Sequence, residues 1–230
     1  MSKIEIFSRQ AFFSSISAHK KRPPHFSRER CFQNLVETTD FSKANLRILF
    51  DLANGPKENH FLKEEKRFPI FEFRGGTETA AFLFLLQTVS RLPIDPETIL
   101  YFVEDDYLHN PSWIEILLEG FQLPDIDYVT LYDHQDKYFL YPELQSQIFV
   151  TPSCHWRTTP STTNTFAVRF RTLLADLAIH RKYSRNRKIS ADHKKFIHLQ
   201  KKGRRLISSI PGWSTHAEPD FTSPCVEWNF

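Results

Sequence analysis

The chain of 230 residues has little glycine, cysteine or methionine: 6, 3 and 1 residues, respectively. So few glycines exclude long Gly-rich linkers, collagen-like repeats and low-complexity segments. The cysteines Cys31, Cys154 and Cys225 are an odd number without CxxC spacing, and a chain of this length can be stabilised by burial without disulfides. We therefore expect one globular domain over 1–230 in a reducing, cytoplasmic compartment.

A long apolar run is also missing. The apolar stretch from Thr79 to Ser90 lies between Glu78 and Arg91, and it is well short of the roughly 20 residues that a membrane-spanning helix needs. No basic segment followed by an apolar stretch of the secretory type is found near the first residue. We expect a soluble protein without a transmembrane segment, although a partner could still hold it at a membrane surface.

An excess of one charge is absent as well, because 30 Lys and Arg oppose 27 Asp and Glu for a net charge of +3. This balance gives no bulk electrostatic reason to expect a nucleic-acid partner. The total conceals an uneven distribution, since residues 181–205 contain 11 Lys and Arg and a single acid, Asp192. That segment is either a solvated helix with basic faces or a polyanion-binding arm on a structural α/β domain.

Phenylalanine is abundant, with 22 residues, so the core is expected to be aromatic. Apolar runs that predict strands alternate with helical stretches through residues 1–132. The predicted strands are 3–7, 45–52, 67–73, 98–103 and 127–132, and the predicted helices are 78–92 and 112–121. This alternation favours an α/β fold, a three-layer α/β/α sandwich with a mostly parallel central sheet. The second half is less regular, with a helix over 170–180.

Three carboxylates, Glu104, Asp105 and Asp106, follow directly after the predicted buried strand 98–103. Ligands of open α/β sheets bind in the crevice beyond the carboxyl ends of the strands. Clustered carboxylates repel one another unless a cation neutralises them. Hard oxygen ligands suit Mg²⁺ or Mn²⁺, which also accept substrate phosphates as ligands. The cluster therefore predicts a divalent-metal site; the alternative is an acidic loop that leads into the next helix.

Three further motifs are candidates for chemistry. Arg74 and Gly75 precede a predicted helix, where glycine lets the backbone approach a ligand and the helix amino end favours a phosphate, although a simple turn would have the same sequence. His216 follows an apolar run, with Trp213 available to wall a site, and a neutral imidazole there is a suitable ligand for Mn²⁺. Asp192 stands at a predicted helix start, as a capping residue or as a general base.

In their order along the chain, these motifs resemble the GT-A class of nucleotide-sugar-dependent glycosyltransferases, in particular the compact GT-A domains of large algal viruses and some bacteria. In that class a carboxylate motif of the DxD type ends a central strand, and 104–106 has this place here. The resemblance implies that Asp106 chelates the metal with His216 completing its shell. It also implies that Asp105 faces the sugar or the metal waters and that Glu104 approaches the ribose.

The resemblance further implies a nucleotide-binding half, 1–132, and an acceptor and catalytic half, 133–230. Asp51, at the end of the second strand, would read the nucleotide base, and Ser8 and Arg9 would hold base and ribose. Three side chains would line the sugar or acceptor side of the site: His155, Trp156 and Trp213. Asp192 would be the catalytic base, although it lacks the acidic neighbour that commonly precedes it.

The function that follows from the resemblance is hexosyl transfer from a nucleoside diphosphate sugar, UDP-linked, to a glycan or other hydroxyl acceptor. Asp192 would deprotonate the acceptor, which would attack with inversion while the metal and Arg74 stabilise the departing diphosphate. Two alternatives remain open from the sequence: a metal-dependent nucleotidyltransferase, and the non-enzymatic polyanion-binding domain described above. Neither the donor sugar nor the acceptor follows from these motifs.

Overall fold

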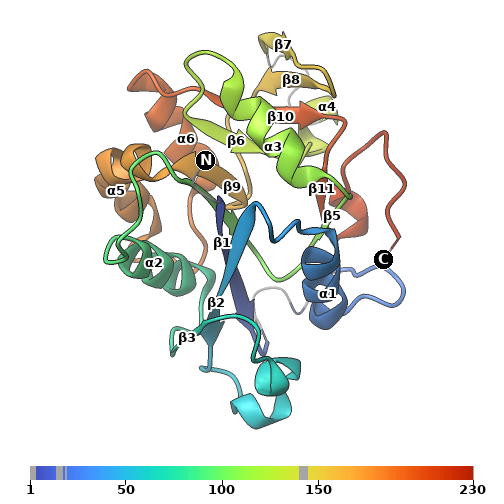
Figure 1. Cartoon of the computed structure of the whole chain (residues 1–230), viewed down its shortest axis with the longest axis vertical. Coiled ribbons are helices and arrows are strands. Elements are labelled where there is room, and N and C mark those ends of the chain that lie inside the picture. Colours follow the sequence, from blue (N-terminus) through green and yellow to red (C-terminus); the bar gives the residue numbers. More distant parts are fainter. Residues whose placement is uncertain (1–3, 14–17, 19, 140–144, 230) are drawn as a thin grey trace.

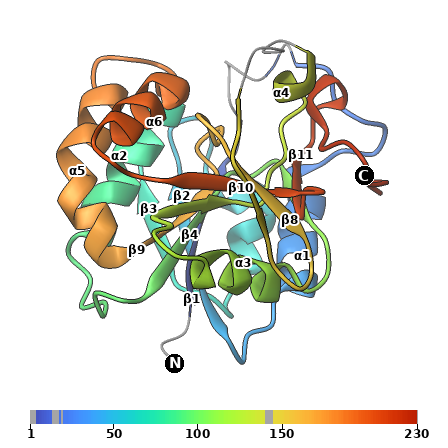
Figure 2. The same ribbon diagram turned by 90° about the horizontal axis from the view of Figure 1, so that it is seen from above.

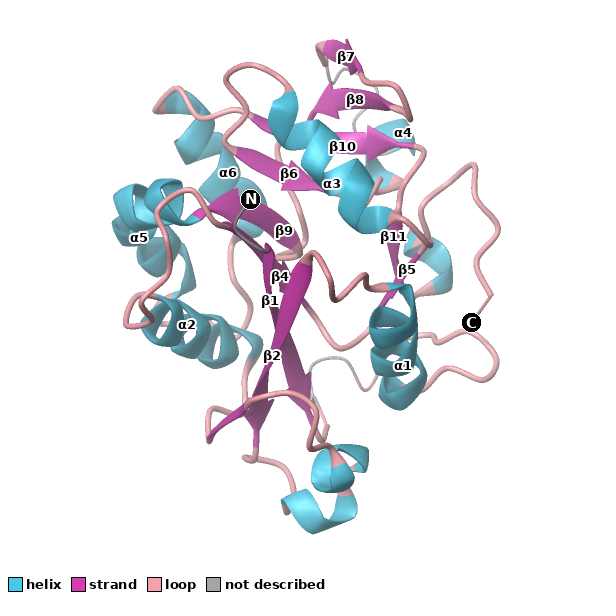
Figure 3. Ribbon diagram, in the orientation of Figure 1, coloured by secondary structure: helices cyan, strands magenta, loops and turns pink. Residues whose placement is uncertain are grey.

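The computed structural model describes residues 4–13, 18, 20–139 and 145–229, and these form a nine-stranded sheet, a two-stranded sheet and flanking helices (Figures 1 and 3). The large sheet has the order β3-β2-β1-β4-β9-β6-β10-β8-β7. Its strands are β1 (Ile4–Ala11), β2 (Ala44–Asp51), β3 (Ile70–Phe73), β4 (Ile99–Val103), β6 (Tyr128–Thr130), β7 (Ile148–Val150), β8 (His155–Thr158), β9 (Phe166–Arg169) and β10 (Leu206–Ile210). The small sheet pairs β5 (Tyr107–His109) with β11 (Ser214–His216). The helices are α1 (Arg28–Thr38), α2 (Glu78–Val89), α3 (Trp113–Gln122), α4 (Asp136–Phe139), α5 (Phe170–Ser184) and α6 (Asp192–Lys201).

The large sheet is mixed, and the protein is of the α/β class as expected. β9 and β8 run against both of their neighbours, whereas the other adjacent pairs are parallel. The expected mostly parallel arrangement therefore holds without interruption only across β3-β2-β1-β4. The reversal at β9 arises because the segment before Phe166 brings the chain back to the edge where β4 ends, so β9 starts there.

Two apolar cores lie on opposite faces of the sheet, because successive strand residues point to opposite sides. In β2, Ile48 and Phe50 belong to the core that α1 and α3 cover. Leu49, between them, belongs to the core that α2, α5 and α6 cover. Figure 2 shows these two groups of helices on either side of the sheet. Both faces of the central strands are thus buried, which explains their continuous apolar sequence.

The helices begin close to where the sequence places them, but one expected cap is not made. α2 starts after Thr77, whose hydroxyl accepts a hydrogen bond from the Ala80 amide at 3.1 Å. α3 starts after Ser112, as predicted, yet Ser112 has a φ of 65° and forms no side-chain cap. A left-handed residue cannot present its hydroxyl to the first helical turn in the usual way.

Strand β1 is longer than the sequence predicts, because it continues through the polar residues Ser8, Arg9 and Gln10 to Ala11. The pairing with β4 covers Glu5 to Ser8, whereas the pairing with β2 continues to Ala11 opposite Asp51, so β2 keeps residues 9–11 in the strand whatever the polarity of their side chains. The strand predicted over 3–7 therefore ends too early, and Arg9 stands on a rigid central strand. Within the described residues, no helix combines the length and apolarity that a membrane span requires.

Candidate active site

A cavity of about 250 Å³ opens at the carboxyl edge of the sheet. β1 has β2 on one side and β4 on the other, so the chain changes direction of winding between β1 and β4. Such a switch point is where ligands of open α/β sheets bind. The cavity is lined there by Arg9, Ala11 and the carboxylates of 104–106, and further along by Asp51, Asn164 and Asp192.

Asp106 and His216 lie side by side, although 110 positions of sequence separate them. β4 ends at Val103, and the chain then enters β5, which pairs antiparallel with β11 so that His216 stands opposite Tyr107. This pairing sets His216 Nε2 at 3.0 Å from Asp106 Oδ2. The two strands of the small sheet therefore have a direct role in building the site. The predicted proximity of these two residues is confirmed.

Glu104, Asp106 and His216 together could hold a metal ion. One ligand atom from each lies within 4.8 Å of the others. Asp106 Oδ1 is buried and has no hydrogen-bond partner in the described part of the chain. An unpartnered buried carboxylate oxygen is costly, because it has lost its water without replacement. The donor set of two carboxylates and one imidazole fits a divalent cation, which would satisfy that oxygen.

The imidazole of His216 is oriented by a second carboxylate. Its Nδ1 lies 3.3 Å from Glu218 Oε2, and Glu218 in turn pairs with Lys20 at 2.9 Å. A carboxylate on one ring nitrogen fixes the proton there and leaves the other nitrogen available as a ligand. Glu218 therefore supports the assignment of Nε2 as the ligand atom.

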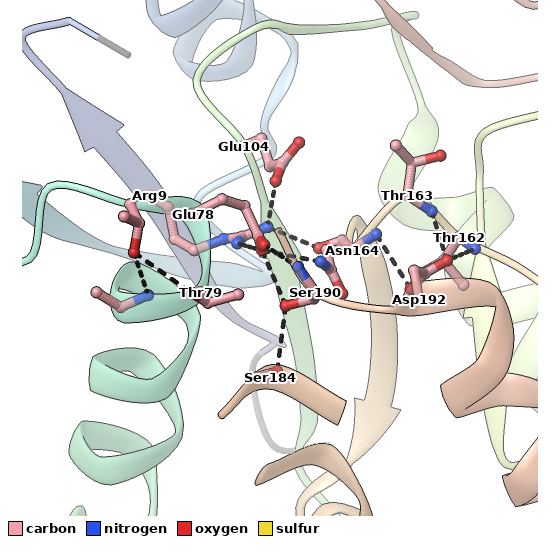
Figure 4. Close-up of polar contacts among 12 residues, drawn as sticks. Arg9, Glu78, Thr79, Glu104, Thr162, Thr163, Asn164, Ser184, Ser190 and Asp192 are labelled. Carbon is pink, nitrogen blue, oxygen red and sulfur yellow. Dashed lines mark hydrogen bonds and ion pairs between the residues drawn. The ribbon is translucent and has the colours of Figure 1, made fainter. Parts of the chain in front are cut away.

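Three arginines surround the acidic cluster. Arg9 donates to Glu104 Oε1 at 3.1 Å, to Glu78 Oε1 at 3.1 Å and to the Asn164 carbonyl at 2.8 Å (Figure 4). Arg22 donates to Asp106 Oδ2 at 2.9 Å, and Arg28 donates to Asp105 Oδ2 at 2.8 Å.

With Lys20 added, four cations face the acids of 104–106. The fold thus places anionic and cationic side chains in one cavity, as the binding of a metal together with phosphates requires.

The carboxyl groups of 104–106 have strongly different pKa values. Burial raises the pKa of Glu104 to about 8, against the opposing effect of Arg9. Burial also raises the pKa of Asp105, although Arg28 opposes this. For Asp106 burial acts in the same direction, but the interactions with His216 and Arg22 outweigh it, so the pKa of Asp106 lies well below its usual range. Asp106 is therefore a carboxylate at every physiological pH, the form that ligates a metal.

Asp192 lines the cavity, but its carboxylate is already occupied. Its Oδ2 accepts from the backbone amides of Thr162 at 2.6 Å and Thr163 at 2.9 Å (Figure 4). Its Oδ1 accepts from the Asn164 amide at 3.3 Å and lies 3.2 Å from Lys195 Nζ.

Burial would raise the pKa of Asp192, yet Lys195 and these amide donors outweigh it and the pKa is lowered. A carboxylate held in this way is a poor general base. Asp192 is the first residue of α6 and does not cap that helix. Its contacts therefore favour an anchoring role, which holds the segment 162–164, over the catalytic one.

The predicted nucleotide-binding residues divide into two groups. Asp51 lines the cavity, and its carboxylate accepts from the amides of Ala53, Gly75 and Gly76 at 2.7–2.9 Å. Ser8 is fully buried and accepts from Gln10, so it does not face the cavity.

In the turn before α2, Gly76 and Thr77 line the cavity, but the predicted phosphate-binding residues Arg74 and Gly75 do not. Arg74 is exposed and donates to the Leu52 carbonyl at 3.0 Å, outside the cavity lining. A Cβ on Gly75 would lie 2.8 Å from Ala80 Cβ and 2.8 Å from Phe73 Cε2. Close packing therefore explains the glycine, and the prediction that Arg74 stabilises a diphosphate has no support in the geometry.

The three residues assigned to the acceptor side lie elsewhere. Trp156 is fully buried in the core, and its ring fills the space beside Gly120. His155 is exposed on β8, toward the far end of the sheet from the cavity. Trp213 packs partly buried against the α1 and α3 side of the core. None of the three lines the cavity, because β8 and the turn at 211–213 belong to a different part of the sheet edge.

Sequence reasoning missed several residues of the site. Arg22 and Arg28 stand before and at the start of α1, a helix that the apolar pattern did not predict. Glu78 and Asn164 meet across the cavity, where Asn164 Nδ2 donates to Glu78 Oε1 at 2.8 Å. The acid Glu78 in the first turn of α2 was visible as a helix-start signal, but no local pattern shows its partners.

Comparison with known proteins adds no family to this picture: no protein-family model matches the chain, and no curated protein matches it either. The GT-A resemblance therefore depends on the motifs and on the site geometry described above.

Proposed function

We propose that this protein is a metal-dependent glycosyltransferase that moves a sugar from a nucleoside diphosphate sugar, with uridine as the expected nucleoside, to an acceptor hydroxyl. The observation that carries the proposal is the group Glu104, Asp106 and His216 in one cavity with Arg9 and Lys20. Acids that can hold a cation, next to cations that can hold phosphates, suit a diphosphate bridged to a divalent metal.

The architecture supports the same proposal. Helices cover both faces of the sheet, and the cavity lies at the strand ends next to the switch point between β1 and β4. Helices on both faces of the sheet and an acidic motif at a strand end are compatible with the arrangement that the GT-A resemblance implies. The mixed part of the sheet, from β9 to β7, is compatible with it because Thr163 and Asn164, shortly before β9, line the cavity.

The three metal-binding residues and Arg9 have defined parts in the proposed reaction. Glu104, Asp106 and His216 would hold Mn²⁺ or Mg²⁺, and the bound ion would act as a Lewis acid on the leaving diphosphate. Arg9 is held rigidly by Glu78 and Glu104, so its positive charge is preorganised toward the cavity. Fixed positive charges of this kind stabilise the negative charge that develops on a leaving group.

Deprotonation of the acceptor is not assigned to Asp192, whose oxygens already accept the contacts described above. The proposal is therefore limited to sugar transfer, and it does not include inversion at the anomeric carbon.

The product distinguishes this function from nucleotidyl transfer. The protein would be incubated with Mn²⁺ and a set of uridine diphosphate sugars, and the released nucleotide would be identified by chromatography. We expect free uridine diphosphate, formed slowly with water and faster with a hydroxyl acceptor. Release of pyrophosphate from a nucleoside triphosphate and a sugar phosphate, without any uridine diphosphate from the sugar nucleotides, would replace the proposal by a nucleotidyltransferase.

A further inference from the structure

Five cations stand without acidic partners at the end of α5 and in the loop that leads to α6. We call them the basic rim: Arg181, Lys182, Arg185, Arg187 and Lys188. None of the five forms an ion pair with any residue that the structure describes. Four of them are exposed, and Arg181 is half-buried.

The cations around the active site behave differently. Arg9, Arg22 and Arg28 each pair with a carboxylate at 3.1 Å or less. Even within 181–205, the pairs are made elsewhere: Lys195 pairs with Asp192, and Arg204 pairs with Asp127 and Asp176. The positive charge of the basic rim is therefore not neutralised inside the molecule, and it is available to an external anion.

The basic rim is continuous with the mouth of the cavity. Ile189 and Ser190 follow it directly, and both line the cavity. The Ser190 amide donates to Glu78 Oε2 at 2.7 Å, and the Thr79 hydroxyl donates to the Arg187 carbonyl. These bonds fix the segment against the amino end of α2, as Figure 1 shows for the chain between α5 and α6 beside α2. A binding partner on the basic rim would lie next to the cavity entrance.

Apolar side chains are exposed on the same surface. Leu174, Ala178 and Arg181 follow one another at spacings of four and three residues, so they share one stripe of α5, and Arg185 comes directly after the last residue of the helix. Leu174 is 43% exposed, and Ile189, in the loop between α5 and α6, is 56% exposed. Ala178, Arg181, Lys182 and Arg185 also line a shallow groove. Cations that flank exposed apolar side chains are typical of surfaces that bind the headgroup region of a membrane.

We propose that the basic rim docks the protein on a membrane surface that carries anionic phospholipid headgroups. Each Lys or Arg near such a surface contributes to binding through the negative surface potential, and Leu174 and Ile189 would enter the boundary between headgroups and acyl chains. Where this docking serves to present a lipid-borne acceptor hydroxyl to the cavity, it depends on the proposed glycosyl transfer. The docking itself does not.

The experiment measures sedimentation of the full chain with vesicles, in the absence of metal and donor. Two kinds of vesicle are used: phosphatidylcholine alone, and phosphatidylcholine mixed with phosphatidylglycerol. We expect binding to the mixed vesicles only. The variant with Arg185→Gln, Arg187→Gln and Lys188→Gln should bind them on the order of 100-fold more weakly, since each cation contributes a factor of about five.

A matched variant has the same change in net charge at exposed cations outside the basic rim: Lys66→Gln, Lys201→Gln and Lys202→Gln. It should bind the mixed vesicles as the unchanged protein does. Equal losses in the two variants would show a general charge effect and overturn the proposal. Binding to soluble dextran sulfate without binding to the vesicles would also overturn it, in favour of a polyanion-binding arm.

A separate assay keeps this proposal distinct from the proposed function. Release of uridine diphosphate from the donor in solution, without vesicles, should be the same in the rim variant and the unchanged protein, because none of the three substituted residues lines the cavity. Vesicle binding without donor turnover would refute the glycosyl transfer alone. Donor turnover without vesicle binding would refute the docking alone.

Discussion

Two carboxylates in one cavity, Asp106 and Asp192, show how differently a fold can use the same side chain. Asp106 keeps one buried oxygen without a partner, while its other oxygen faces His216 and Arg22. Asp192 accepts from backbone amides on both of its oxygens, and Lys195 lies next to one of them. The first arrangement is incomplete without a ligand, and the second is complete by itself. Position at a cavity wall is thus a weaker guide to chemistry than the number of unsatisfied acceptor sites.

The strongest test of this contrast is Asp106→Asn. The substitution removes the charge that a divalent ion requires, so we expect the affinity for Mn²⁺, measured by calorimetry, to fall by more than about 100-fold. Release of uridine diphosphate should be lost with it. Glu72→Gln, a comparable change at an exposed acid on β3, should leave both unchanged. Mn²⁺ affinity within twofold of the unchanged protein would refute the metal assignment.

Asp192→Asn should act on stability and leave metal binding unaltered. It leaves the fully buried Lys195 without its charge partner, and breaking a buried ion pair in this way costs about 3 kcal/mol of unfolding free energy. Urea unfolding measures this loss. The double variant Asp192→Asn with Lys195→Met should recover part of it, because no unpaired buried charge remains.

The opposite result for Asp192 would be equally informative. If Asp192→Asn unfolds at the urea concentration of the unchanged protein and yet abolishes transfer while Mn²⁺ still binds, Asp192 is the general base that the sequence motif suggested, and our interpretation of its contacts is wrong.

Low pH should lower the free energy of unfolding through His109, which lies on β5 next to the Asp106 side of the cavity. Its Nε2 is 2.8 Å from the Tyr101 hydroxyl of β4, and burial lowers its pKa to about 3. The unfolded chain has a histidine pKa of about 6.5, so it binds the extra proton first as the pH falls. The stability that neutral His109 provides is complete above pH 6.5 and decreases between there and about 3.

At pH 5 this linkage corresponds to a loss of about 2 kcal/mol relative to pH 7. It is measured as the difference between the unchanged protein and His109→Gln in urea unfolding at the two pH values. If the variant loses as much stability as the unchanged protein over this interval, other groups are responsible for the acid sensitivity.

The strands and the acidic motif could be predicted because their signals are local. The run 98–103 is apolar since both faces of β4 are covered. The three acids that follow this run directly therefore indicate the end of the strand. His216 was predicted from the polar turn after an apolar run. Its contact with Asp106 depends on the pairing of β5 with β11, two strands of three residues that are too short to produce a periodic pattern.

The errors have a common physical origin in contacts between distant residues. Asp192 stands where a catalytic base was expected at a helix start, but its donors come from residues 28–30 positions away. Trp156 was assigned to the acceptor side because the surrounding sequence is irregular, whereas its ring is needed beside Gly120, on α3. The strand predicted over 3–7 stops short of Ala11, because residues 8–10 are polar and the sequence does not show that the pairing with β2 continues through them.

The smallest expected effect concerns Arg22, which contacts the same oxygen of Asp106 as His216 does. Its guanidinium donates to Asp106 Oδ2 at 2.9 Å and to the Ala217 carbonyl at 2.8 Å, and it lies 4.4 Å from the Phe26 ring. A positive charge in this position competes with a metal ion for the carboxylate, but it is also favourable for a bound diphosphate. In Arg22→Gln we therefore expect Mn²⁺ to bind about fivefold more tightly, on the order of 1 kcal/mol, and uridine diphosphate to bind more weakly by a similar factor.

Arg30→Gln, at an exposed arginine on α1 whose guanidinium donates to the His25 carbonyl, is the control for the loss of one charge in calorimetric titrations of both ligands. A decrease in Mn²⁺ affinity in Arg22→Gln would mean that the arginine orients Asp106 for the metal, and the Asp106 side of the cavity would then be as preorganised as the Asp192 side.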